Sequence, residues 1–107
     1  MKVYLNRKNG VFAVGEFNPS DKSLVVKKGS IISNVISNSE KFRGKANIEK
    51  YRKEYVDGDM VKKDVSFKSA STAANLVTGM STNGLIAWKD KDGKTIKMIL
   101  SEVDADE

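Results

Sequence analysis

A run of cationic side chains in the middle of the chain has the clearest chemical potential. Between residues 41 and 53 six cations face a single acid, Glu49; they are Lys41, Arg43, Lys45, Lys50, Arg52 and Lys53. Cations at this density bind phosphate groups, and such contacts supply much of the affinity for nucleic acids. Phe42 lies inside the run and could stack on a base, as in proteins that bind single strands. The run predicts a surface that binds a polyanion.

A second interpretation of this run stays open. In a helix over residues 48–56, Glu49 would pair with Lys53 and Lys50 with Glu54 at i,i+4, which weakens the local field. Lys50 and Lys53 also lie opposite the apolar side of that helix, where a solvated helix ordinarily carries charge. The run would then be a solvated face and not a binding site.

Charge is distributed unevenly along the chain. Residues 1–68 hold 15 Lys and Arg against 8 acids, a balance of +7, whereas residues 69–107 hold 4 against 6, a balance of −2. A basic first part is consistent with a nucleic-acid partner, although it does not require one.

The segment GMSTNG at residues 79–84 offers a second candidate contact surface. Phosphate-binding loops run from a strand into a helix, whereas this segment follows a predicted helix, so we expect a structural turn. Backbone amides in such turns can still meet phosphates. The contact residues on this alternative are Ser81, Asn83 and Gly84.

Two absences exclude most catalytic chemistry. The chain has no Cys and no His, so it has no thiolate nucleophile, no imidazole base and no cysteine or histidine metal site. The acid pairs Asp57/Asp59 and Asp90/Asp92 stand beside glycines without the spacing of a calcium loop, which indicates turns. We therefore expect a non-enzymatic protein with no cofactor and no metal.

The sequence of the first half of the chain predicts three strands, a loop and a helix. Alternation and turn residues predict strands over 2–6, 11–17 and 23–28, with a hairpin turn at Asn9-Gly10 in which both residues take positive φ. Residues 29–44 are polar and predict a loop. Asn47 is the expected cap of a helix over 48–56, and Gly58 its left-handed stop.

The second half predicts one further helix and two strands. Residues 60–67 are expected to be extended, and a helix over 70–78 is bounded by Ser69 and Gly79. Apolar residues on both faces predict strands over 85–88 and 95–100, joined at Asp92-Gly93. Trp88, Tyr51 and Tyr55 are expected in the core.

These elements indicate one α+β domain over residues 1–107, with short antiparallel strands, two helices and a frayed acidic tail over 101–107. No apolar run approaches the length of a membrane span, and the first residues lack the apolar centre of a secretory signal. The expected location is the cytoplasm.

A set of motifs in residues 24–100 matches a known pattern in order and spacing. They are Gly29-Ser30, the helix ending in Gly58, Phe67-Lys68-Ser69-Ala70-Ser71 with Ala73-Ala74, Gly79, Asn83-Gly84, Trp88 and Asp92-Gly93. In these the chain resembles an uncharacterised bacterial domain family that is found fused to GIY-YIG endonucleases or to restriction-modification proteins. Ala70 stands where the family often has Pro, and Leu85 where it often has an aromatic residue.

The resemblance implies nuclease or methyltransferase partners, and hence DNA. Together with the charge it gives our expectation of an accessory module that binds nucleic acid through Lys41, Arg43, Lys45, Arg52 and Lys53. The alternative is a protein-interaction module that docks a partner subunit through the Ala-rich helix or an edge strand.

Overall fold

Three strands form an antiparallel meander at the start of the chain, as the alternation predicts. The computed structural model describes residues 1–105, in which β1 spans Lys2–Asn6, β2 spans Phe12–Phe17 and β3 spans Leu24–Val26. The register runs from Lys2↔Glu16 to Asn6↔Phe12, and from Gly15↔Val26 to Phe17↔Leu24. The Asn9-Gly10 turn is present, but only Gly10 takes positive φ (90°), so the expectation for Asn9 was wrong.

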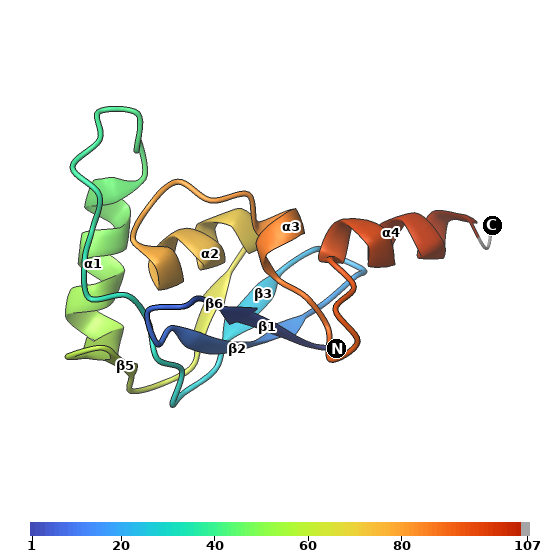
Figure 1. Cartoon of the computed structure of the whole chain (residues 1–107), viewed down its shortest axis with the longest axis horizontal. Coiled ribbons are helices and arrows are strands. Elements are labelled where there is room, and N and C mark those ends of the chain that lie inside the picture. The colour runs from blue at the N-terminus through green and yellow to red at the C-terminus, as the bar shows by residue number, and fades with distance from the viewer. Residues whose placement is uncertain (106–107) are drawn as a thin grey trace.

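A fourth strand and a small hairpin complete the strand framework (Figure 1). Strand β6 (Val65–Phe67) pairs antiparallel with β3, which gives the order β1-β2-β3-β6. Strands β4 (Val56–Asp57) and β5 (Met60–Val61) form the hairpin, with Gly58 at φ 65° in its turn. Ile31 bridges Phe12 and Met60 and so links the hairpin to the sheet. The rest of the 29–44 segment has no helix or strand, as predicted.

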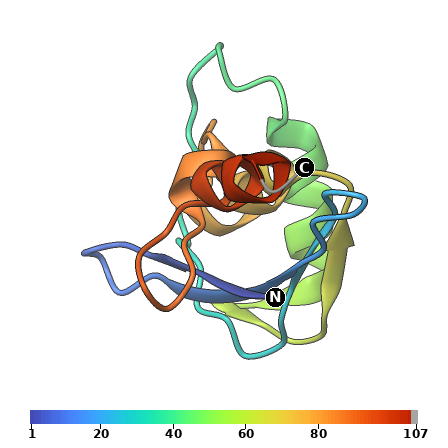
Figure 2. The ribbon, with the colours of Figure 1, turned by 90° about the vertical axis from the view of Figure 1, so that its right-hand side faces the viewer.

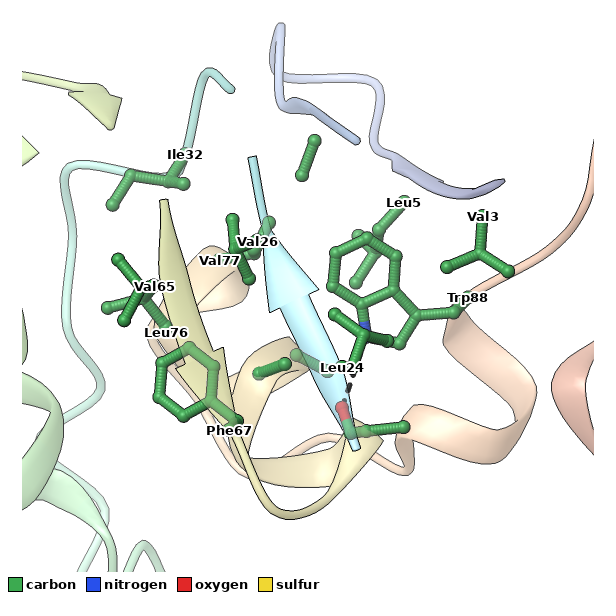
Figure 3. Packing of buried hydrophobic residues seen from close by; sticks show 14 of the residues in the cluster. Val3, Leu5, Leu24, Val26, Ile32, Val65, Phe67, Leu76, Val77 and Trp88 are labelled. Atoms are coloured by element: carbon green, nitrogen blue, oxygen red, sulfur yellow. Dashed lines mark hydrogen bonds between the residues drawn. The ribbon is translucent and has the colours of Figure 1, made fainter. Parts of the chain in front are cut away.

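Helix α2 (Ala70–Thr78) covers one face of the sheet, and its bounds match the prediction. The Ser69 hydroxyl accepts a hydrogen bond from the Thr72 amide at 3.1 Å, and Gly79 ends the helix at φ 73°. Leu76 and Val77 of this helix pack with Leu24, Val26 and Phe67 of the strands (Figure 3); further buried members of the core are Val3, Leu5, Ala13, Phe17, Val65, Ala73, Ala74 and Trp88.

Helix α1 (Lys45–Tyr55) begins two residues before the predicted cap. Gly44 occupies the N-cap position without a side-chain hydrogen bond, so Asn47 is not the cap, and Gly58 belongs to the β4–β5 turn. Ile48 is buried, and Tyr51 packs on Phe67 with their ring centroids 4.9 Å apart. The apolar side of the helix was therefore predicted correctly, although its ends were not.

The strands predicted over 85–88 and 95–100 are helices. Helix α3 (Gly84–Ala87) starts where the Asn83 carboxamide accepts from the Leu85 amide at 3.1 Å. Helix α4 (Ile96–Ala105) starts where the Thr95 hydroxyl accepts from the Met98 amide at 3.2 Å. These are capping hydrogen bonds, which favour helix over strand. Asp92-Gly93 is a turn as predicted, with Gly93 at φ 85°, but it joins two helices.

Helix α4 projects from one end of the molecule, opposite α1 (Figure 1). The acidic segment over 101–107, which was expected to be frayed, continues this helix to Ala105, and residues 106–107 lie outside the described part. The chain is thus α+β as predicted, with four helices in the described residues where two were expected.

Trp88 ties the α3 segment to α2 in the centre of the core (Figure 3). Its side chain is 0% exposed, and the indole Nε1–H donates to the Ala70 carbonyl at 3.1 Å. We expect Trp88→Phe to lower the free energy of unfolding by about 2 kcal/mol, because a buried hydrogen bond is lost and a small cavity forms. Urea unfolding followed by circular dichroism measures this, since Trp88 is the sole tryptophan. Leu85→Ala, at a side chain 38% exposed, is the control, and equal effects of both would contradict the prediction.

Candidate nucleic-acid interface

Three of the predicted contact cations, Lys41, Arg43 and Lys53, are exposed on α1 or in the turn before it, and so is Lys50 of the same run. We call Lys41, Arg43, Lys50 and Lys53 the α1 surface; all four side chains are exposed. Lys45 is half-buried, and its Nζ donates to the Asn38 carboxamide at 2.8 Å.

The expected ion pairs within α1 do not form. Glu49 lies 3.9 Å from Lys45 and does not pair with Lys53, and Lys50 has no ion pair with Glu54. Within the described residues, none of the α1 surface cations has an acid within 4.0 Å. Residues 40–54 still carry six cations against three acids, Glu40, Glu49 and Glu54, a balance of +3. The field of this segment is therefore positive and is not neutralised by close pairs.

Two predicted contact residues, Phe42 and Arg52, make contacts that stabilise the fold. Phe42 is 5% exposed and belongs to the hydrophobic core, so its ring cannot stack on a base while the core is intact. Arg52 donates from Nε and Nη2 to the Leu76 carbonyl at 3.2 and 2.7 Å. That carbonyl is one of the last four of α2, which lack partners within the helix. Burial lowers the pKa of Arg52.

The turn at 79–84 uses the amides of Thr82 and Gly84 internally. The Thr82 amide donates to the Asn75 carboxamide at 2.8 Å, and the Gly84 amide donates to the Ser71 hydroxyl at 3.0 Å. Gly84 is buried, and a Cβ there would lie 2.2 Å from the Ala70 carbonyl group. The turn is structural, as expected, and Gly84 cannot contact a phosphate. Ser81 and Asn83 remain exposed.

A hollow beside β1 gathers side chains that the sequence does not bring together. We call it the β1 hollow; its volume is about 590 Å³ and it is lined by Tyr4, Asn6, Arg7, Thr82, Asn83, Ile86, Ala87, Lys89, Asp90, Lys91 and Gly93. Lys89 exchanges two backbone hydrogen bonds with Tyr4, at 2.7 and 3.0 Å, which brings the segment after α3 alongside the strand. Figure 2 shows the β1–β2 turn and the loop before α4 projecting on the same side of the molecule.

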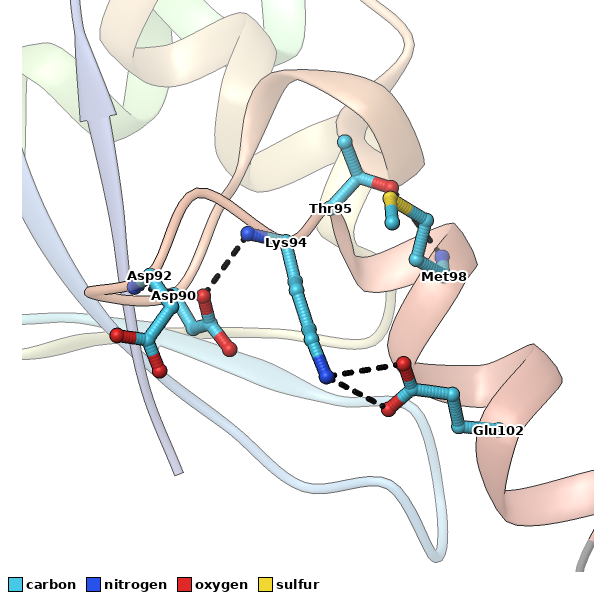
Figure 4. A network of polar contacts seen from close by, with 6 residues as sticks. All are labelled: Asp90, Asp92, Lys94, Thr95, Met98 and Glu102. Atoms are coloured by element: carbon cyan, nitrogen blue, oxygen red, sulfur yellow. Dashed lines mark hydrogen bonds and ion pairs between the residues drawn. The ribbon is translucent and has the colours of Figure 1, made fainter.

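The hollow has a positive charge balance because three cations, Arg7, Lys89 and Lys91, line it with a single acid, Asp90. Asp90 accepts from the Asp92 and Lys94 amides, both at 2.9 Å (Figure 4). The Lys94 ammonium reaches Glu102 of α4 at 3.0 Å, and this hydrogen bond raises the pKa of Lys94. Arg7, Lys89 and Lys91 are exposed and, in the part of the chain that the structure describes, have no acid within 4.0 Å.

Other kinds of site are not formed by the described residues. Among the residues whose side chains the structure describes, no group of three or more acids is arranged to hold a metal ion. Nor does any helix among them have the length and apolar character that crossing a membrane requires.

The comparisons with known proteins identify a family without an established function. The model of the family described as "Domain of unknown function (DUF4357)" matches residues 3–100. No curated protein and no solved structure matches the chain significantly. The match starts in β1, so it includes the strand and the turn that supply Tyr4, Asn6 and Arg7 to the β1 hollow.

Arg52 can be separated from the binding cations by its effect on stability. We expect Arg52→Ala to lower the free energy of unfolding by about 1–3 kcal/mol, because the Leu76 carbonyl loses a charged donor in a half-buried place. Thermal unfolding measures this. Lys53→Ala, one residue along the same helix, removes the same charge from an exposed position and should change stability by less than about 0.5 kcal/mol.

Gly84 should likewise prove essential to folding. We expect Gly84→Ala to destabilise the protein by several kcal/mol or to prevent folding, since the added methyl group meets backbone atoms of Ala70 that cannot move aside. The matched control is Gly44→Ala, whose Cβ would lie 3.6 Å from Phe42, an ordinary contact. Urea unfolding measures the free energy of unfolding of both variants. A Gly84→Ala protein as stable as the Gly44→Ala protein would contradict the packing described.

Proposed function

We propose that this chain, which belongs to the DUF4357 family, is a non-enzymatic accessory module that binds nucleic acid, in the first instance DNA. The single observation that supports this most is the α1 surface, whose four exposed cations have no acid within 4.0 Å among the described residues. The resemblance of the sequence to domains fused to nucleases and restriction-modification proteins supports the same partner.

The expected mechanism is electrostatic. Lys41 and Arg43 precede the helix, and Lys50 and Lys53 lie at i,i+3 on its outer side, so they can contact successive phosphates of one backbone. Each contact releases condensed counterions, which makes affinity fall as salt is added. Such contacts orient a duplex but read no sequence, so any base preference must come from elsewhere.

The alternative of a protein-docking module is restricted by the packing. The small side chains of α2, Ala73 and Ala74, are 0% exposed beneath the sheet, so this face is not free for a partner. The exposed large apolar side chains are instead spread over several elements; Val35 is 67%, Met80 53% and Ile86 of α3 51% exposed. Substitution of Lys41, Arg43 and Lys45 together separates the two functions, because a docking module would keep its partner.

The electrostatic proposal predicts a measurable salt dependence. We expect duplex DNA affinity to fall linearly on a plot of log K against log salt, and Lys53→Ala to reduce the slope by about one unit. Fluorescence anisotropy with a labelled duplex measures both. Lys97→Ala on α4 is the control; it removes the same charge at the opposite end of the molecule (Figure 1) and should leave the slope unchanged. An absence of binding at low salt, or equal effects of the two variants, would refute the proposal.

A further inference from the structure

The β1 hollow has the size of a ligand site and is separate from the α1 surface. Its volume of about 590 Å³ falls in the range of small-molecule sites, roughly 300–1,000 Å³. None of the α1 surface residues lines it. It can therefore be tested independently of them.

Tyr4 is the aromatic residue among those that line the hollow. It also borders a neighbouring recess of about 320 Å³, together with Lys2 and Asp92. Its ring packs at a tilt against Phe12, with the ring centroids 6.4 Å apart. The backbone of Tyr4 is held on both sides, by its pairing with Val14 in β2 and with Lys89. Tyr4 therefore brings an aromatic ring to this part of the molecule, and a flat group can stack on such a ring.

Cations and carboxamides line the hollow together with Tyr4. Arg7, Lys89 and Lys91 supply three positive charges, whereas Asp90, the one acid, accepts from amides of its own turn. The Asn83 carboxamide oxygen already accepts from the Leu85 amide, which leaves its NH₂ group to donate to a ligand. A ligand that fits must therefore combine a negative charge, hydrogen-bond acceptors and a flat ring.

We propose that the β1 hollow binds a nucleoside phosphate, with its base on Tyr4 and its phosphate between Arg7 and Lys91. The ligand is a free nucleotide or one unpaired nucleotide of a single strand, which share this chemistry. The inference does not rest on the α1 surface, because a free nucleotide can occupy the hollow without contact to α1.

Nuclear magnetic resonance titration of ¹⁵N-labelled protein at low salt tests the inference with three probes. These are thymidine 5′-monophosphate, the oligonucleotide dT6 and inorganic phosphate. We expect the first two to shift the amides of Tyr4, Arg7 and Lys89, and phosphate alone to shift them much less, because it cannot stack. If the amide shifts saturate with the mononucleotide, the ligand is a free nucleotide. If only dT6 shifts these amides, the ligand is a nucleotide within a single strand. If neither nucleotide probe shifts these amides, the inference is wrong.

Variants separate stacking from charge. We expect Tyr4→Leu to weaken dT6 binding about tenfold and Tyr4→Phe to keep it, since phenylalanine retains the ring. Arg7→Ala with Lys91→Ala should also weaken it, at exposed positions where folding is not at risk. Lys50→Ala with Lys53→Ala removes the same charge from α1 and should leave mononucleotide binding unchanged. Wild-type binding by a folded Tyr4→Leu protein, or by the Arg7/Lys91 double variant, would overturn the inference.

The two proposals fail in different ways. Loss of duplex binding in the wild-type protein together with persistent mononucleotide shifts at Tyr4 would refute the α1 function and support the hollow. Duplex binding that depends on Lys53, without any nucleotide shift at Tyr4, would refute the hollow alone.

Discussion

The interlock between the first turn of α2 and residues 84–88 is the constraint on which the rest of the structure depends. Gly84 lies so close to Ala70 that no side chain fits between them, and its amide donates to the Ser71 hydroxyl at 3.0 Å. Four residues later the Trp88 indole donates to the Ala70 carbonyl at 3.1 Å. Three contacts therefore involve two consecutive residues of α2, Ala70 and Ser71. They are the close approach of Gly84, its amide hydrogen bond and the indole hydrogen bond of Trp88, and together they fix where α3 begins and ends.

The same interlock builds the β1 hollow. Trp88 packs over β2 at Gly15, where a Cβ would lie 3.2 Å from the indole ring. The chain leaves this anchored position directly at Lys89, which bonds to Tyr4 of β1. One wall of the hollow is therefore a strand near the start of the chain, and the facing wall is a segment held by α2. The turn that follows is fixed by Asp90 and by the Lys94–Glu102 ion pair, so the lining is not a free loop.

Sequence patterns predicted the elements that local signals specify. Strands with alternating apolar residues and the helix between Ser69 and Gly79 were predicted because capping and alternation act over a few residues. Residues 85–88 and 95–100 were assigned wrongly as strands because short apolar runs do not distinguish a strand from a buried helix. Asn83 was interpreted as a turn residue, whereas its carboxamide caps a helical turn.

The candidate site was predictable only where it is local. The cations of the α1 surface lie together in sequence, and a helix keeps them together in space. Burial is set by tertiary packing, so local sequence patterns did not indicate that Phe42 joins the core or that Arg52 donates to a carbonyl of α2. The β1 hollow was not predicted, because the pairing of Tyr4 with Lys89 joins distant segments through backbone atoms, which carry no sequence signal.

Most residues of the motif described in the sequence analysis differ from the residues proposed to bind, although Asn83 and Gly93 belong to the motif and also line the β1 hollow. Ser69, Ser71, Gly84 and Trp88 cap α2 or close the interlock, so a fold of this kind requires them whatever it binds. The exposed cations satisfy no buried group, and most can change without cost to folding. A chain can therefore keep the motif and lose the α1 surface or the β1 hollow. Binding must therefore be assigned from the side chains at these two surfaces, because a shared fold does not by itself imply a shared function.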